Sequence, residues 1–553
     1  MSRQVMKIAV LAALSSVICV GTSLAGSGNR AVVEVRPGMD VQRTLDEAAD
    51  GSVVLFKAGD YLIETALYVS NKTDFVIRGE SGTRFVIRFS PVEAKKTSAD
   101  GFLCNGCRGL TFERISFTTD RPINCNGTVV AVDPEHDRYD VLIDEGFPLD
   151  PGQVLGATDT VTADGVPDFV IQSYCDTPYE IIGERTIRVS GPRRSWSPKW
   201  RYDYSKLKKG QRIVYRYMRS GRHVFRLSNC EDMVFRDVNL ERYASFGVRI
   251  CPRSRNATFE RFTVLAPVGA KELMPGNVDG IHVQGMSGKL ILKDCHFRGL
   301  GDDALNVHSL AGFVKAYDAQ TGNIDIRRHD RNAGVVLHDD RWAQTGDEIL
   351  VYDPKTFLEK GKFIISGHRR GHGRVTKLVG KLEIGDVLSN NAFNPQVVVS
   401  GCVFENSSSR GVLLQSQNML VENCRFSGHI HAGLLVAPDI KMWNEVGPAR
   451  NVEIRNCEFT RCGIGSMMAN LGAIVIKASH DVGAAEYPAG VHDSIAIRNC
   501  HFHDNGTRGV YASAVRGLTL ENNRFERNAL SPDRLAEFPD VRMVNCEDVK
   551  ERK

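Results

Sequence analysis

The chain has 553 residues, with 70 Lys and Arg against 66 Asp and Glu and a formal net charge of +4. A chain of this length can bury a large core, so its stability needs neither disulfides nor a structural metal. The nearly balanced charge argues against a nucleic-acid-binding surface, which would show a clustered basic excess, and no nucleic-acid partner is expected. The 14 cysteines are too few for a disulfide scaffold and too many to ignore.

Residues 1–25 have the pattern of a secretory signal peptide. Arg3 and Lys7 precede an almost wholly apolar run at residues 8–20, and small residues at 23 and 25 form a cleavage site. The apolar run is too short to span a bilayer, which takes about 20 residues. We therefore expect export to the periplasm, the cell surface or the medium, and no membrane span in the mature chain.

Residues 26–121 are expected to hold an N-terminal cap and the first coils of a repeat. Val41, Leu45 and Ala48 have the spacing of one helical face, and the stretch at 53–61 then enters the repeat. A short helix in this position covers the open end of a solenoid.

Two later stretches, 122–219 and 312–388, interrupt the repeat. Both contain a glycine-polar turn before an apolar strand, as at Gly210–Tyr215 and Gly346–Tyr352. This order is typical of small antiparallel sheets. We expect two inserted antiparallel β-barrel-like domains, with long irregular loops as the alternative.

The repeat itself carries a short unit of the form Asn-Cys-x-Phe. Its copies or near copies occupy residues 294–297, 401–404, 423–426, 456–459, 499–502 and 522–525. From Cys402 on, successive second positions are 22, 33, 43 and 23 residues apart. Two of these intervals match one coil of about 23 residues, and the longer ones imply inserted loops.

A second unit, x-Gly-apolar-x-apolar, alternates with the first. It occupies residues 246–250, 279–283, 410–414, 432–436 and 508–512, and residues 303–307 are a variant with Ala for Gly. Short strands of period 2 separated by turns at this spacing predict a right-handed parallel β-helix, and the leucines of leucine-rich repeats are missing. The fold class is therefore all-β, with catalytic coils in 220–311 and C-terminal coils in 389–553.

Three aspartates converge in this arrangement. Asp279 and Asp303 are 24 residues apart, which is one coil, and Asp302 lies beside them. Strands in successive coils stack about 4.8 Å apart, so the three carboxylates should be neighbours, and Arg410 should lie in the same column. Carboxylates this close cannot all ionise normally, which suits a general acid and a general base. Aspartates that merely tolerate turns are the structural alternative.

The paired motifs Asp279-Gly-Ile-His282 and Gly301-Asp-Asp-Ala-Leu-Asn-Val-His308 resemble the core of glycoside hydrolase family 110, the α-1,3-galactosidases. Trp443-Asn-Glu445-Val-Gly-Pro resembles that family's Trp-x-Glu-x-Gly-Pro segment. The resemblance covers most of the mature chain. It implies an exoglycosidase that removes terminal α-1,3-linked galactose from blood-group-B-type and related glycans with inversion. It also implies Asp279, Asp302 and Asp303 as the catalytic candidates.

Polygalacturonases of family 28 are the closest alternative. They share an Asn-x-Asp and an Asp-Asp one coil later, as at Asn277–Asp279 and Asp302-Asp303. Their Gly-His-Gly should follow soon afterwards, but here Gly371–Gly373 comes about 70 residues later. The near-neutral charge also fits an uncharged sugar better than an acidic pectin.

A single-displacement mechanism follows from the implied inversion, with Asp302 as the acid and Asp279 and Asp303 holding the water. The assignment within the trio stays open. The substrate-binding candidates are His282, Asn306, His308, Arg410, Trp443 and Glu445. Structural roles remain open for each of them, such as a packed histidine, a turn asparagine or a buried aromatic.

No cofactor or metal is expected. Cys104-Asn-Gly-Cys107 has no matching second pair, and the histidines show no compact metal-ligand spacing. The expected partners are oligosaccharides or glycoconjugates. A non-catalytic glycan-binding or adhesive β-helix remains a second hypothesis for function.

The repeat also explains several cysteines. Cys295, Cys402, Cys424, Cys457 and Cys500 share one repeating position, which Asn523 takes in the last unit. We expect an inward-facing ladder of buried thiols and no disulfide framework, despite the export signal.

Overall fold

The computed structural model describes residues 30–89, 100–149, 155–173, 177, 179–190, 206–217, 223–327, 341–438, 440–464, 471–478, 487–530 and 539–552. The expected signal peptide lies outside these residues. No helix in the described part of the chain is both long and apolar enough to cross a bilayer.

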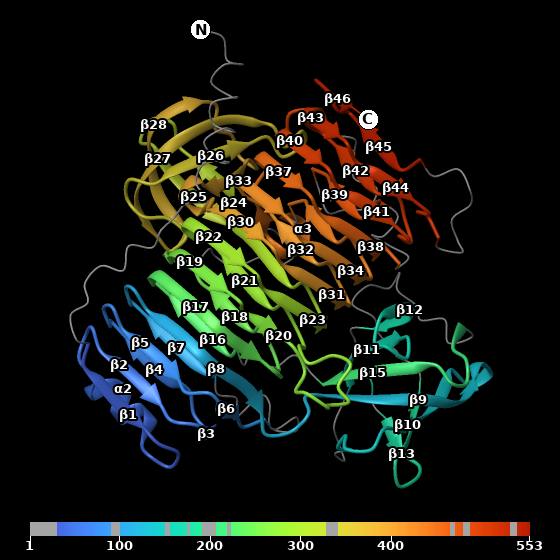
Figure 1. The fold of residues 1–553 in the computed structure, drawn as a ribbon. Coiled ribbons are helices and arrows are strands. Elements are labelled where there is room, and N and C mark those ends of the chain that lie inside the picture. Colours follow the sequence, from blue (N-terminus) through green and yellow to red (C-terminus); the bar gives the residue numbers. More distant parts are fainter. Residues whose placement is uncertain are drawn as a thin grey trace.

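The chain winds into a parallel β-helix whose coils each place strands on three faces (Figure 1). The first face holds β1 (Val32–Val35), β2 (Val53–Phe56), β5 (Val76–Gly79), β8 (Thr111–Thr119), β17 (Glu231–Leu240), β19 (Arg255–Glu260), β22 (Ser287–Lys293), β30 (Gln396–Ser400), β33 (Gln417–Glu422), β37 (Arg450–Arg455), β40 (His492–Arg498), β43 (Val515–Glu521) and β46 (Lys550–Arg552).

The second face follows it around each coil. It holds β3 (Gly59–Ile63), β6 (Thr83–Ile87), the ends of β8 and β17, β20 (Thr263–Val264), β23 (His296–Leu300), β31 (Val403–Ser407), β34 (Arg425–His429), β38 (Glu458–Cys462), β41 (His501–His503) and β44 (Arg524–Glu526).

The third face completes the coils. It holds β4 (Leu67–Ser70), β7 (Phe102–Asn105), β16 (Phe225–Ser228), β18 (Val248–Ile250), β21 (Ile281–Gln284), the start of β24 (Leu305–Tyr317), β32 (Val412–Leu414), β35 (Leu434–Val436), β39 (Ile474–Ile476), β42 (Val510–Ser513) and β45 (Val541–Val544). All pairings along these faces are parallel, which confirms the predicted β-helix.

A short helix, α2 (Val41–Glu47), packs at the N-terminal end of the coils. Asp40 caps it by accepting from the amide of Arg43 at 3.0 Å, which satisfies one of the free amides of the first turn. Leu45 is the buried contact of this helix with the first coils.

The Asn-Cys-x-Phe unit has a direct physical explanation. Its first residue turns the chain between the first and second faces in the left-handed region, with φ of 54° at Asn423 and 53° at Asn456. Asn tolerates this conformation far better than most residues. The Cys and Phe then point inward and the residue between them points out. The thiols of the repeat are free and buried, which confirms the expected ladder.

The phenylalanines of the same unit form a continuous stack in the core. Phe297, Phe404, Phe426, Phe459, Phe502 and Phe525 follow one another with centroids 4.7–5.4 Å apart and nearly parallel rings. The spacing follows from the coil rise, because each coil adds one strand at about 4.8 Å.

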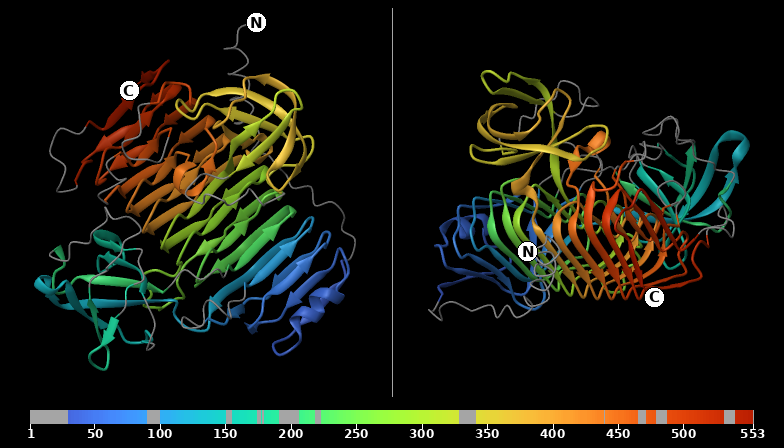
Figure 2. Two further views of the ribbon diagram at one scale, coloured as in Figure 1. Left: turned by 180° about the vertical axis from the view of Figure 1, so that it is seen from behind. Right: turned by 90° about the horizontal axis from the view of Figure 1, so that it is seen from above.

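Two antiparallel units leave the β-helix and lie on the same side of the row of coils (Figure 2). The first contains β9 (Asn124–Asp133), the 3-10 turn Pro134–His136, β10 (Arg138–Ile143), β11 (Leu155–Val161), β12 (Pro167–Ser173), β13 (Tyr179–Ile181), β14 (Thr186–Ser190) and β15 (Arg212–Tyr217). These strands form one sheet in the order β12-β11-β15-β9-β10-β14-β13, so within the described residues β12 and β13 are its edges.

The second unit closes into a barrel. It continues β24 and adds β25 (Asn323–Arg327), β26 (Glu348–Tyr352), β27 (Glu359–Arg369), β28 (His372–Gly380) and β29 (Val387–Asn390), followed by the 3-10 turn Asn391–Phe393. Pairing runs β24-β25-β28-β27-β26-β29 and returns to β24. β24 starts in the β-helix and ends in the barrel, so one continuous strand belongs to both parts.

Candidate active site

The three predicted carboxylates lie where adjacent coils enter the third face. Asp279 precedes β21 and Asp303 precedes β24, and the amide of Gly280 donates to the carbonyl of Asp303 at 2.9 Å. One carboxylate oxygen from each of Asp279, Asp302 and Asp303 lies within 4.8 Å of the other two. The coil repeat therefore brings the three carboxyl groups into one cluster, here called the Asp trio.

The members of the Asp trio differ in accessibility. The side chain of Asp303 is 1% exposed and that of Asp279 is 5% exposed, whereas that of Asp302 is 20% exposed. Asp302 is thus the member that an incoming molecule can reach first.

Arg410, one coil further along, fixes Asp303. Its Nε donates to Oδ1 at 2.7 Å, its Nη2 to Oδ2 at 2.8 Å and its backbone amide to Oδ1 at 3.1 Å. Burial raises the pKa of Asp303 to about 7, and Asp302 and Asp279 act in the same direction while Arg410 opposes them. The Asp trio therefore still holds a proton near neutral pH, as expected for acid chemistry.

A line of side chains extends from Asp279 through two histidines. Asp279 Oδ2 and His282 Nδ1 are 2.7 Å apart, and His282 Nε2 and His308 Nε2 are 3.2 Å apart. His308 Nε2 also lies 3.6 Å from Glu445 Oε1, and Gln415 donates to Glu445 Oε2 at 3.0 Å. The candidates His282, His308 and Glu445 are therefore linked to the Asp trio.

Donor and acceptor rules fix the protons along this line. His308 Nδ1 is 2.9 Å from the Ser309 carbonyl, which can only accept, so Nδ1 carries the proton and Nε2 of a neutral His308 accepts. His282 must then donate from Nε2. Its Nδ1 is left to accept a proton from Asp279 or, as an imidazolium, to donate to it. Burial lowers the pKa of His282 to about 4, and burial also lowers that of His308, which favours neutral rings.

Two other candidates lie on segments that also carry residues of this line. Asn306 lies beside His282 on the third face and is buried, and its Oδ1 has no hydrogen-bond partner in the described structure. A buried acceptor without a partner is costly, so it suits a ligand hydroxyl. Trp443 ends the one-turn helix α3 (Ile440–Trp443) and is 48% exposed, just before Glu445 in β36 (Glu445–Val446).

Three polar residues near the site were not among the predicted binding residues. Arg249 pairs with His282 across β18 and β21, and its Nη2 donates to Gln284 at 3.4 Å. His431 lies one coil after Arg410, and burial together with Arg410 lowers its pKa to about 3. Gln415 contacts Glu445. The spacing of the coils could have identified His431, because it precedes Ala432-Gly433 as Asp302 precedes Asp303-Ala304.

The first insert holds the turns that carry the Asp trio. Arg216 of β15 is fully buried, and its Nη1 donates to the carbonyls of Asn277 at 3.1 Å and Gly301 at 2.8 Å. Its Nε donates to Asp159 at 2.8 Å. A Cβ on Gly301 would lie 2.3 Å from Arg216 Nη1, so glycine is required for this contact.

The second insert bears on the same site through β24. This strand carries Asn306 and His308 and pairs in antiparallel fashion with β36, where Leu310 lies opposite Glu445. The predicted Gly371–Gly373 motif lies at the hairpin between β27 and β28, within the barrel and not in a coil beside the Asp trio. The polygalacturonase-like placement of this motif is therefore not found.

Three carboxylates are donors that hard cations prefer. Here both oxygens of Asp303 already accept from Arg410, and Asp279 is bonded to His282. The cluster thus has cationic and hydrogen-bonding partners from the chain itself, which suits proton transfer.

The chain is similar to known proteins over nearly its whole length. It is 22% identical to an α-1,3-galactosidase A of Shewanella woodyi, covering 96% of this chain and 91% of that protein. It is 24% identical to an α-1,3-galactosidase A of Bacteroides thetaiotaomicron, covering 94% and 95%. A family model described as a right handed beta helix region matches residues 445–547.

Solved structures are more distant. The catalytic domain of a GH87 α-1,3-glucanase in complex with nigerose aligns with a TM-score of 0.42 and 10% identity, over 94% of this chain and 70% of that one. An exopolygalacturonase of Thermotoga maritima aligns with a TM-score of 0.41 and 10% identity, over 94% and 91%. The full-length relatives confirm the resemblance predicted from the motifs and the expected glycosidase class.

Proposed function

We propose that this glycosidase is an exo-acting α-1,3-galactosidase that removes terminal α-1,3-linked galactose from blood-group-B-type and related glycans. The observation that carries the proposal is the Asp trio, whose carboxylates converge within 4.8 Å in a chain similar end to end to α-1,3-galactosidases. The segment at residues 1–25 supports the further proposal that the enzyme is exported.

The exposure of the carboxyl groups favours Asp302 as the general acid. Asp302 is the most accessible member of the Asp trio, so it can reach the glycosidic oxygen of a bound sugar and protonate it. Asp279 and Asp303 lie deeper and position the attacking water. Arg410 holds Asp303 in place, and the line from Asp279 to His308 provides a route for the proton that the water releases.

The remaining candidates serve to bind the sugar. Asn306 offers a buried oxygen to a hydroxyl, and Glu445 accepts from hydroxyls. Trp443 is exposed enough to stack on the apolar face of galactose.

Inversion of configuration is proposed from the family resemblance. Carboxyl groups of inverting enzymes are usually about 6.5–9.5 Å apart, which leaves room for the water. The nearest oxygens of the Asp trio are closer than that. The stereochemistry therefore has to be measured, by NMR of the first-formed anomer, and release of α-galactose would contradict the proposed single displacement.

The substrate is tested by sugar release from linear and fucosylated α-1,3-galactosides, with α-1,4- and α-1,6-galactosides and polygalacturonate as competing substrates. We expect galactose from the α-1,3 linkage only. Asp302→Asn should lower kcat by about 10²–10⁴-fold, the typical contribution of a general acid, while glycan binding persists. Binding without any hydrolysis by the wild-type chain would identify a glycan-binding protein instead, and release of galacturonate would identify a pectin hydrolase.

A further inference from the structure

A second cluster of potential ligands lies on the second face, in later coils than the Asp trio. Glu458 is in β38, and His501 and His503 are in the next strand, β41. The two histidines point outward, because the residue between them, Phe502, is the buried member of the strand. One donor atom from each of Glu458, His501 and His503 lies within 4.8 Å of the other two.

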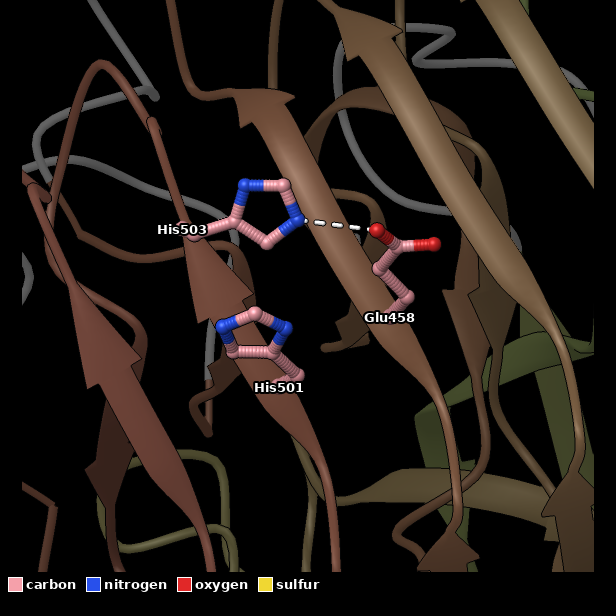
Figure 3. A group of neighbouring side chains, drawn as sticks. All are labelled: Glu458, His501 and His503. Atoms are coloured by element: carbon pink, nitrogen blue, oxygen red, sulfur yellow. Dashed lines mark hydrogen bonds and ion pairs between the residues drawn. The ribbon is translucent and has the colours of Figure 1, made fainter.

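The donor atoms face a shared space (Figure 3). His503 Nε2 is 2.8 Å from Glu458 Oε1, and the rings of His501 and His503 have centroids 4.4 Å apart. His501 Nε2 is engaged by Glu526 at 3.3 Å, which leaves Nδ1 as the nitrogen that faces the shared space. All three side chains are partly exposed, so water can complete the coordination.

Each histidine is oriented by a carboxylate on its other ring nitrogen. Asp504 Oδ2 lies 2.8 Å from His503 Nδ1, and Glu526 Oε2 lies 3.3 Å from His501 Nε2. This carboxylate–histidine arrangement is the usual support behind metal-binding imidazoles, since it fixes the tautomer and strengthens the free nitrogen as a ligand.

Arginines in turn hold these carboxylates in place. Arg527 donates to both oxygens of Asp504, at 2.7 and 2.9 Å, and Arg524 pairs with Glu526. Arg425 Nε lies 3.5 Å from Glu458 Oε2 and leaves Oε1 toward the histidines. The three arginines also balance the charge of the carboxylates, so the cluster is more than an acidic patch.

We propose that Glu458, His501 and His503 form a zinc-binding site that links two successive coils of the β-helix. Two imidazoles and one carboxylate with an open position for water are a preferred donor set for Zn²⁺. Binding replaces the proton between His503 Nε2 and Glu458 Oε1, and this proton is released to solvent. The ion would join coils that the long excursion between β38 and β41 separates along the chain.

The test uses the full chain, treated with EDTA, dialysed and titrated with ZnCl₂ in a calorimeter. We expect one tight equivalent and a higher melting temperature with zinc, since an ion that binds only the folded state stabilises it. His501→Ala and His503→Ala should each lose the tight equivalent. Asp504→Asn keeps an acceptor for His503 Nδ1 but removes the negative charge behind the ring, and it should weaken zinc binding by about 10–100-fold. Co²⁺ absorbance then reports imidazole ligation directly.

A matched control lies on the same face. His296 Nε2 is 2.9 Å from Glu405 Oε2, and within the described residues this His–Glu pair belongs to no group of three potential metal ligands. His296→Ala should leave zinc binding unchanged, and galactose release should persist in all these variants, which separates this proposal from the catalytic one. Three results would overturn the proposal. They are weak zinc uptake at several sites, a tightly bound zinc ion that remains in both His501→Ala and His503→Ala, and loss of the tightly bound zinc ion in Asp303→Asn.

Discussion

At the scale of single residues, the Asp279–His282–His308 line carries one proton in addition to the one on each neutral imidazole, and any of the three residues can hold it. A neutral His308 directs the proton of His282 to Nε2 and turns the Nδ1 lone pair toward Asp279, which favours the protonated carboxyl. This proton can also reach His308, beside Glu445: Asp279 protonates His282 at Nδ1, and His282 passes its Nε2 proton to His308. Once this proton has moved to His308, Asp279 is ionised and can accept the proton that the water releases.

This arrangement predicts a pH effect for His308. The pKa of Asp303 is raised to about 7, so the proton of the Asp trio is present below that pH and is lost as the pH rises through it. Wild-type activity should fall over the same range. In His308→Leu, His282 is free to carry its proton on Nδ1 and donate to an ionised Asp279. The negative charge of Asp279 raises the pKa of Asp303 further, so the fall should begin about one pH unit higher.

The measurement is kcat/KM between about pH 5 and about pH 9. His308→Gln is the control, because its amide oxygen still accepts from His282 Nε2 and should keep the wild-type profile. An unchanged profile in His308→Leu would show that the histidine only packs. A rise in KM with unchanged kcat would show that His308 only binds sugar.

At the scale of the strand and its turn, each Asn-Cys-x-Phe unit is one step of the core. The left-handed turn residue sets the corner, the thiol packs under it, and the phenylalanine stacks on its neighbour from the previous coil. Stability is therefore additive along the solenoid, with each step supported by the two next to it.

Phe459→Ala should consequently destabilise the chain strongly. Phe459 is fully buried between Phe426 and Phe502, and removal of such a ring costs about 3–5 kcal/mol through lost burial and the cavity it leaves. Urea unfolding followed by circular dichroism measures the change. Phe525→Ala is the matched control, because Phe525 ends the stack, is only partly buried and should cost clearly less. Equal losses at both positions would contradict a stepwise core.

The repeat of these units determined which positions of neighbouring coils the sequence could predict to lie together. The coil spacing located Asp279, Asp303 and Arg410 in one column because parallel strands repeat position by position. It could not predict that Arg410 would bond both oxygens of Asp303, since rotamers depend on neighbours. The same units place Glu458 and His501 at one position of successive coils, 43 residues apart, but they do not show that the side chains of Glu458, His501 and His503 turn toward one another, since this too depends on rotamers.

At the scale of the whole molecule, the two inserts act on one site from outside the coils. The barrel continues the strand that carries Asn306 and His308, and the first sheet contributes Arg216 to the turns before Asp279 and Asp302. The contact of Arg216 could not be predicted from the sequence, because residues 122–219 show no periodicity that would place one of their arginines beside the catalytic coils.

Arg216 therefore tests whether the first insert positions the Asp trio. Arg216→Lys keeps the charge beside Asp159, but one ammonium group cannot also reach both carbonyls in the geometry of the guanidinium fork. We expect kcat/KM to fall by about 10²-fold, the cost of a small misplacement of catalytic groups, together with a lower melting temperature.

The control for this experiment comes from the same sheet. Arg188 makes a two-pronged pair with Asp140 at 2.8 and 2.9 Å, but it is partly exposed and bonds within the insert. Arg188→Lys should leave kcat/KM unchanged and shift stability by less than about 1 kcal/mol. If Arg216→Lys lowers the melting temperature but not kcat/KM, the arginine stabilises the junction without positioning the carboxylates. A selective loss of kcat would instead make the insert part of the catalytic machinery, which would explain why an interrupted β-helix keeps it.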